Sequence, residues 1–224
     1  MGKIIYDKFD KKLIATLPQA LFGGKIVVVL SEMEAEAAVD YLLGQPILGF
    51  DTETRPTFKK GESRDVALLQ VSTHDVCFLF RLNIIGLPSC VIRLLENKKV
   101  PIIGLSVHDD LHSLQKRSAF TPGCFLDIQD MVGDLGIQDR ALQKLYANIF
   151  GEKITKREQL TNWEKDVLTD RQKLYAATDA WACIRLYEEV ARLKAEGDYD
   201  LVVTEKEEAP HASVTNKIQQ NDGI

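Results

Sequence analysis

The sequence predicts a three-layer α/β domain in which a mixed β-sheet lies between helices. Short apolar, β-branched runs alternate with segments of helical periodicity over residues 25–128. Two of these runs, 66–72 and 76–82, are separated by only three turn residues, which indicates an antiparallel hairpin. From residue 139 onward the periodicity is helical, so helices follow the strands. A hairpin beside strands that are joined through helices makes the sheet mixed and not purely parallel.

The elements follow one another at regular intervals. Strands are expected at 25–30, 47–54, 66–72, 76–82, 100–105 and 124–128. Ser31 and Glu34 form a capping box that begins a helix, which ends near Gly44. Pro88 opens a short helix to Leu95, and further helices are expected at about 109–117, at 139–150 before Gly151, and from the capping box Thr169 and Gln172 to about 195.

The chain divides into three parts. Residues 1–24 are weakly patterned and are expected to form an arm, residues 25–204 form the domain, and residues 205–224 have no apolar periodicity and are expected to be disordered. The first residues contain no apolar signal segment, and no run approaches the length needed to span a membrane. The four cysteines have no metal-binding spacing. We therefore expect a cytoplasmic protein with reduced thiols.

Composition excludes only one class of function. The chain has 224 residues, 27% of them charged, and a net charge of −5. This balance argues against a protein that coats nucleic acid non-specifically. It leaves a nucleic-acid enzyme open, because a metal site can be acidic while its surroundings are basic.

Two acids end the strand at 47–54. Side chains at positions i and i+2 of a strand share a face, so Asp51 and Glu53 converge and Thr52 points away. Two carboxylates this close raise each other's pKa unless a cation lies between them. A divalent cation with oxygen ligands would resolve this repulsion, although a solvated strand end would also accommodate the pair.

Two further stretches carry acids. Asp109 and Asp110 open a helix, where the helix dipole favours acids. Tyr175 and Asp179 lie four residues apart on a helix that is apolar around most of its circumference, and a buried aspartate needs a hydrogen-bond partner or a metal. A strand end, a helix start and a buried helix can meet at one edge of an α/β sheet. Four acids and a tyrosine there would make a two-metal site.

These motifs, in this order, resemble those of the DEDD 3′→5′ exonucleases. The motif D-x-E after a strand, a later Asp that opens a helix, and Y-x-x-x-D on a near-final helix all occur, and the tyrosine spacing is that of the DEDDy branch. The stretches "FDTE", "NWE" and "YAATDA" are similar to those of ribonuclease D and of the exonuclease domain of the Werner-syndrome helicase. The resemblance covers about residues 25–195.

The resemblance implies a ribonuclease-H-like fold and a set of site residues. The metal ligands would be Asp51, Glu53, Asp110 and Asp179, holding two divalent cations, Mg²⁺ or Mn²⁺, and Tyr175 would hold the attacking water. Asp110 is preferred to Asp109 because it directly precedes Leu111, as the family's acid precedes its apolar helix positions.

The activity that the resemblance implies is 3′→5′ hydrolysis of phosphodiester bonds in DNA or RNA, with release of nucleoside 5′-monophosphates. The sequence leaves open DNA or RNA, a single-stranded or recessed 3′ end, the metal and the oligomeric state.

A nucleic-acid substrate requires basic residues near the site. The loop after the first two acids carries Arg55, Lys59, Lys60 and Arg64, which are expected to bind the substrate. In the same loop Phe58 is positioned to stack on a terminal base or to pack beneath the loop. Other basic clusters are Lys116 with Arg117, and Lys153 with Lys156 and Arg157.

Two other functions compete with this interpretation. His108 and His112 in "HDDLH" resemble the helix of zinc proteases, but the base glutamate is replaced by aspartate and no third ligand is evident. Alternatively, the chain is a catalytically inactive exonuclease fold that binds nucleic acid or acts as an adaptor. The presence of all four acids and the tyrosine argues against this alternative.

Overall fold

The central feature of the computed structural model is one six-stranded sheet. The structure describes residues 2–59 and 61–204, so the predicted disorder of residues 205–224 lies outside the described part. The strands lie in the order β2-β5-β4-β3-β6-β7. Their bounds are Lys25–Val29 (β2), Leu48–Thr54 (β3), Val66–Ser72 (β4), Val76–Phe80 (β5), Ile102–Gly104 (β6) and Phe125–Asp127 (β7).

The sheet is mixed, as the sequence predicts. Strand β4 pairs antiparallel with both β3 and β5, which confirms the predicted hairpin. The other pairs, β2–β5, β3–β6 and β6–β7, are parallel. Strand β6 is only three residues long and, of β3, it pairs with Leu48 and Gly49 alone, so the second half of β3 has an open edge on that side.

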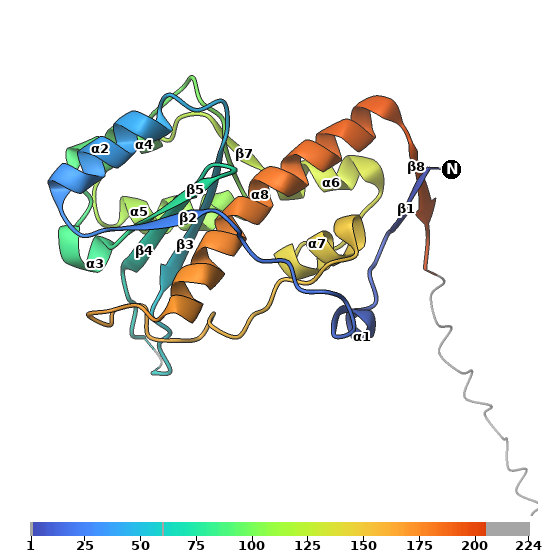
Figure 1. Ribbon diagram of the computed structural model, residues 1–224, viewed down its shortest axis with the longest axis horizontal. Helices are drawn as coiled ribbons and strands as arrows, with labels where there is room; N and C mark the ends of the chain where they lie inside the picture. Colours follow the sequence, from blue (N-terminus) through green and yellow to red (C-terminus); the bar gives the residue numbers. More distant parts are fainter. Residues whose placement is uncertain (1, 60, 205–224) are drawn as a thin grey trace, which may run out of the picture.

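Helices cover both faces and complete the three layers (Figure 1). On one face the apolar residues of α2 (Glu32–Leu42), α4 (Ser89–Leu95) and α5 (Val107–Gln115) pack against β3 and β4. On the other face lie α6 (Ile128–Val132), α7 (Leu142–Phe150) and the long α8 (Asp170–Glu196). Both predicted capping boxes are present, at the starts of α2 and α8.

Two short strands that the sequence analysis missed join the two ends of the described chain. Strand β1 (Lys3–Tyr6) pairs parallel with β8 (Tyr199–Val202), apart from the main sheet. The first 24 residues, expected only to form an arm, also contain α1 (Lys11–Ile14) and bury four apolar side chains. These are Ile5, Phe9, Ala20 and Phe22.

One predicted strand ends earlier than expected. Strand β5 stops at Phe80 instead of residue 82, and α3 (Leu82–Ile85) follows. At Arg81 the chain turns into α3, because the Arg81 carbonyl accepts hydrogen bonds from the N–H groups of Ile84 and Ile85. The Arg81 side chain is almost fully buried and donates hydrogen bonds to the carbonyl oxygens of Lys165 and Asp166, the acceptors that a buried guanidinium needs. Among the described residues, no helix has the length and apolar character needed to cross a membrane.

Candidate active site

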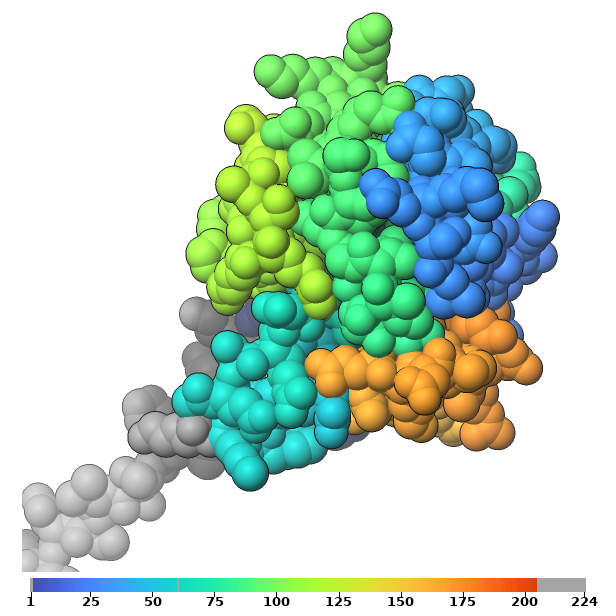
Figure 2. All heavy atoms as spheres, turned by 90° about the vertical axis from the view of Figure 1, so that its left-hand side faces the viewer, coloured from blue at the N-terminus to red at the C-terminus, as the bar shows by residue number. Residues whose placement is uncertain are grey.

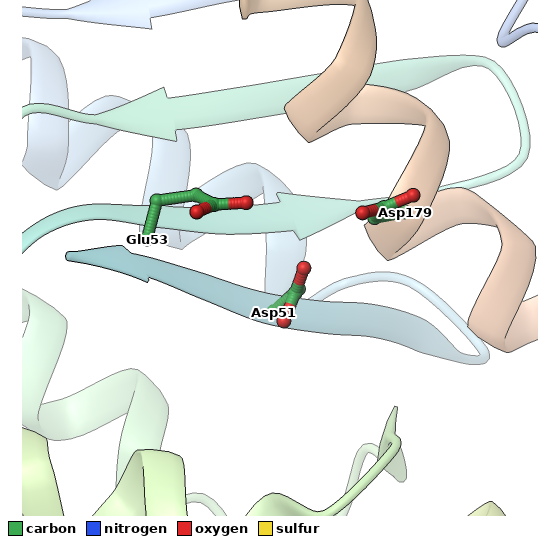
Figure 3. Close-up of side chains that lie close together, drawn as sticks. All are labelled: Asp51, Glu53 and Asp179. Atoms are coloured by element: carbon green, nitrogen blue, oxygen red, sulfur yellow. The ribbon is translucent and has the colours of Figure 1, made fainter. Parts of the chain in front are cut away.

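Strand β3 and helix α8 bring three acids together. Gly49, Asp51 and Glu53 share the face of β3 toward α8. At Gly49 the helix comes so close that an added Cβ atom would lie 1.9 Å from the carbonyl oxygen of Ala180. This contact places the neighbouring Asp179 over the strand. Oxygen atoms of Asp51, Glu53 and Asp179 lie within 4.8 Å of one another, and the three carboxylates point toward one another (Figure 3).

The fourth predicted acid approaches from α5, across the open edge of β3. The Thr52 hydroxyl donates a hydrogen bond to the Asp110 carboxylate. The negative charge of Asp110 is close enough to contribute to the raised pKa of Asp51. By contrast the Asp109 side chain is 92% exposed. Asp110 thus lies beside the three clustered acids, and Asp109 points to solvent.

A strained turn fixes the start of α5. Ser106, which precedes the helix, has a φ of 59°, a left-handed conformation that costs a non-glycine residue free energy. The Asp127 carboxylate accepts hydrogen bonds from the backbone N–H groups of Ser106 and Val107, at 3.1 and 2.9 Å. The Gln129 amide donates to the Ser106 hydroxyl at 2.7 Å. These contacts hold the turn that directs Asp110 toward β3.

Burial raises the pKa of every acid in the group, and repulsion from neighbouring carboxylates adds to this rise for Asp51, Glu53 and Asp110. Burial, followed by the charges of Asp110 and Asp179, raises the pKa of Asp51 well above its ordinary value. Burial, followed by the charge of Asp51, raises the pKa of Glu53 to about 10. Burial raises the pKa of Asp179 to about 7 and that of Asp110 to about 6. Without a cation the group therefore retains protons at neutral pH.

Tyr175 lies one helical turn before Asp179 and is 8% exposed. Burial, followed by the charges of Asp179 and Glu53, raises the pKa of its phenol far above the ordinary value. The hydroxyl therefore keeps its proton and can act as a hydrogen-bond donor in the site. Its ring lies against Trp163, with a centroid distance of 6.0 Å, and this contact holds it in place.

Asp51, Glu53 and Asp179 line a cleft of about 300 Å³, here called the catalytic cleft. It is also lined by Tyr175, Arg140, Gln143, Lys156 and Gln159. The positive charge of Lys156 partly offsets the effect of burial on the pKa of Asp179. The sequence analysis assigned Lys156 only to a basic cluster and missed Arg140, because nothing in the local pattern indicates that the segment before α7 faces the acids.

The predicted substrate-binding loop lies next to the catalytic cleft but does not line it. Arg55 and Arg64 both pair with Glu164, at 3.1 and 3.5 Å. In Figure 2 the cyan residues near position 60 accordingly lie beside the orange residues near 165. Phe58 is 88% exposed, so the alternative that it packs beneath the loop is wrong. Lys59 is exposed, and Lys60 lies outside the described residues.

The histidines of "HDDLH" do not form a metal site with the acids. The group of three side chains within 4.8 Å that could hold a metal ion contains aspartate and glutamate but no histidine. The His108 side chain is 95% exposed, and its near neighbour is Asp109, at 3.9 Å. The described geometry therefore gives no support to a zinc-protease interpretation.

Several curated proteins are similar to this chain. A bifunctional 3′-5′ exonuclease/ATP-dependent helicase WRN of Mus musculus is 29% identical over 153 residues, which cover 66% of this chain and 11% of that protein. An exonuclease 3′-5′ domain-containing protein 2 of Drosophila melanogaster is 31% identical over 150 residues, which cover 65% of this chain and 25% of that protein. The chain thus spans only a minor part of these two relatives.

Solved structures share the fold. The Aedes aegypti Nibbler EXO domain has a TM-score of 0.69 at 21% identity, covering 78% of this chain and 91% of that one. Escherichia coli RNase D, described as an exoribonuclease involved in structured RNA processing, has a TM-score of 0.68 at 18% identity, covering 78% and 46%. Trypanosoma brucei RNase D in complex with RNA U12 has a TM-score of 0.66 at 19% identity, covering 78% and 70%.

The match to a known family extends over most of the chain. A family model described as 3′-5′ exonuclease matches residues 26–193, about three quarters of the sequence. The matched segment runs from β2 to near the end of α8 and contains all four acids and Tyr175. On the strength of this match and of the shared fold, the chain belongs to the 3′-5′ exonuclease family.

Proposed function

We propose that this protein is a 3′→5′ exonuclease that hydrolyses phosphodiester bonds of DNA or RNA and releases nucleoside 5′-monophosphates. The observation that carries the proposal is the convergence of Asp51, Glu53 and Asp179 within 4.8 Å, with Asp110 beside them. Three carboxylates this close in a buried place raise the free energy of the folded state unless a cation or protons offset their charge. Such an arrangement is typical of a site that binds metal.

The donor set fits divalent metal ions. All four side chains offer carboxylate oxygens, the ligands that Mg²⁺ and Mn²⁺ prefer. The Asp179 Oδ1 atom is buried and has no hydrogen-bond partner among the described residues, so it has an unused acceptor. Asp51, Glu53, Asp110 and Asp179 would hold two such cations. When bound, a pair of cations supplies activation of a water nucleophile and stabilisation of the departing 3′ oxygen.

Other side chains of the catalytic cleft would orient the reactants. The Tyr175 hydroxyl, which keeps its proton beside Asp179, would donate a hydrogen bond to the attacking water. Arg140 and Lys156 line the same cleft and would bind the phosphate that is attacked. Holding water and phosphate in fixed positions lowers the entropic part of the barrier.

The loop after β3 would contact the last nucleotides of the substrate. Phe58 is exposed and free to stack on a terminal base, and Lys59 and Lys60 would contact phosphates. Arg55 and Arg64 would have to exchange Glu164 for a substrate phosphate. We propose that the protein acts in the cytoplasm. An RNA substrate is supported by the T. brucei relative crystallised with RNA U12.

The test is a nuclease assay with single-stranded and recessed-end DNA and RNA oligonucleotides, 5′-labelled, with free or blocked 3′ ends. We expect stepwise shortening from a free 3′ end in Mg²⁺ or Mn²⁺, no reaction in EDTA, and none with Asp179→Asn. The matched control is Asp170→Asn on the same helix, whose side chain is 98% exposed. Activity that persists in EDTA would contradict the proposal, and binding without hydrolysis would point to the inactive adaptor.

A further inference from the structure

A second groove with a strongly basic lining lies next to the catalytic cleft. It has a volume of about 600 Å³ and lies between α1, the beginning of α7 and residues 153–157. In Figure 1 helix α1 lies close to α7. Five lining residues are cationic and none of those described is acidic: Lys11, Lys144, Lys153, Lys156 and Arg157. In a chain with a net charge of −5, this basic groove is a local excess of positive charge.

The basic groove is continuous with the catalytic cleft. Ala141, Gln143 and Lys156 line both. A chain molecule that has one end at the acids can therefore pass over Lys156 and continue along α7 toward α1. The two sites have opposite charge, which suits a substrate with repeated phosphates whose terminal phosphate meets metal ions.

Part of the groove wall is fixed by hydrogen bonds within the protein. The Lys153 backbone N–H donates to the Pro18 carbonyl at 2.8 Å, and the Ala20 N–H donates to the Lys153 carbonyl at 2.9 Å. The Lys153 ammonium donates to the Ala15 carbonyl at 2.5 Å. The segment after α1 is therefore held against residue 153, and the groove exists before any ligand binds.

Some cationic side chains of the groove bond to other groups of the protein, and others form no salt bridge among the described residues. Lys144 pairs with the buried Asp139 at 2.7 Å, so its charge is largely offset. Lys11, Lys156 and Arg157 are exposed, and none of the three forms a salt bridge within the described residues. These three positive charges are the ones available to a ligand.

We propose that the basic groove binds the sugar-phosphate backbone of the single strand that lies upstream of the 3′ end, through Lys11 and Arg157, while Lys156 at the junction with the catalytic cleft binds the phosphate that is attacked. This inference rests on the proposed function, because it takes the 3′ end to lie among the acids. It assigns a role in substrate binding to α1, which lies outside the segment matched by the exonuclease family.

The test compares Lys11→Gln/Arg157→Gln with a control of the same charge change, Lys98→Gln/Lys99→Gln, whose residues are exposed and do not line the groove. Binding of a fluorescent single-stranded 12-mer is measured by anisotropy in EDTA, where no hydrolysis occurs, at several salt concentrations. The logarithm of the binding constant K falls as log salt rises, and each lost phosphate contact makes this fall less steep by about 0.7 for a single strand. We expect the groove variant to bind more weakly and to reduce the steepness of this fall by about 1.4. The control should change neither quantity.

Cleavage of a dinucleotide, which is too short to fill the groove, should proceed at the same rate in the groove variant and the wild type. An unchanged slope and Kd for the groove variant would overturn the proposal, as would an equal loss in the control. Thermal melts check that the variants are folded. If the wild type hydrolyses nothing but its binding still depends on Lys11 and Arg157, the nuclease proposal fails while the binding role of the groove stands.

Discussion

At the scale of single residues, successive side chains of β3 point to opposite faces, and each face contacts a different acid of the site. The odd-numbered positions face α8, so Gly49 admits the helix and Asp51 and Glu53 meet Asp179. Thr52 faces the other way and bonds Asp110. The convergence of Asp51 and Glu53 follows from the two-residue period and is predictable from sequence. The Thr52–Asp110 contact is not, because it depends on β6 being too short to cover that edge of β3.

Asp110 and Asp109 provide a test of the second acidic motif. Asp110 lies beside the three clustered acids, while the Asp109 side chain is 92% exposed. We expect Asp110→Asn to remove nearly all turnover at saturating Mg²⁺ and Asp109→Asn to keep most of it. Steady-state kinetics on both variants, with thermal melts as a control for folding, check this. A larger loss for Asp109→Asn would shift the motif by one residue.

The raised pKa values predict how stability depends on pH when no metal is present. The pKa of Asp110 rises from 3.8 to about 6, and that of Asp179 from 3.8 to about 7. A raised pKa in the folded state means that the folded protein holds protons that the unfolded chain releases. The contribution of these two groups to the free energy of unfolding in EDTA is therefore highest below about pH 3.8, and it falls as pH rises to about 7.

Denaturant titrations between pH 4 and 8 in EDTA would measure this dependence. In Asp179→Asn one of the two groups is gone, so the fall in unfolding free energy with pH should be shallower than in the wild type. The control Asp200→Asn changes an exposed acid and should leave the slope as it is. Adding Mg²⁺ should stabilise the wild type more at pH 8 than at pH 5, because metal and protons compete for the same oxygens. A wild-type slope equal to that of Asp179→Asn would contradict the prediction.

At the scale of elements, the site depends on how closely α8 approaches β3. In Gly49→Ala the new Cβ atom would lie 1.9 Å from a backbone oxygen of α8, so the helix must move outward and carry Asp179 with it. We expect a loss of about 3 kcal/mol in unfolding free energy, together with a large loss of metal-dependent activity.

The control is Gly133→Ala. Gly133 has a helical φ of −60°, and a Cβ atom there would meet nothing within 4 Å. This variant should gain about 0.4–1 kcal/mol through a less flexible unfolded chain. Chemical denaturation measures the unfolding free energy of both variants, and assays measure their metal-dependent activity. Full activity in Gly49→Ala would show that the position of Asp179 does not depend on this contact.

The elements that the sequence predicts are those with strong local signals. Helix α8 has a capping box at Thr169 and Gln172, a long apolar pattern and a glycine at its end, and it runs to Glu196, one residue beyond the prediction. Strands β1 and β8 have four residues each and exist only because they pair with each other from opposite ends of the chain. Local propensity cannot reveal such a pairing.

At the scale of the whole molecule, the first and last described segments hold each other. The Asp7 carboxylate accepts hydrogen bonds from the backbone N–H and the hydroxyl of Thr204, at 2.9 and 2.8 Å. The Asn148 side chain bonds both backbone groups of Tyr6, which fixes β1 against α7. A division into an arm of residues 1–24 and a domain of residues 25–204 therefore separates segments that are joined in the fold.

This organisation predicts that a chain of residues 25–204 is much less stable than one of residues 1–204. Removing the first 24 residues exposes the surfaces that Ile5, Phe9 and Phe22 cover, each about 8% exposed or less. At about 1.5–3 kcal/mol for each large apolar side chain, the loss is about 5–9 kcal/mol. This is comparable to the total stability of a typical domain, about 5–15 kcal/mol.

We therefore expect residues 25–204 to melt at least about 10 °C lower than residues 1–204, or not to fold. Residues 1–204 should match the full chain in melting temperature and activity, because residues 205–224 have no apolar periodicity with which to contribute to a core. Calorimetry on the three chains, with hydrolysis of a short oligonucleotide as a second readout, separates the two effects. If residues 25–204 melt at the temperature of the full chain, the contacts of Ile5, Phe9 and Phe22 contribute nothing net to folding. If residues 1–204 melt well below the full chain, the last 20 residues contribute to stability, and the inference from their lack of apolar periodicity is wrong.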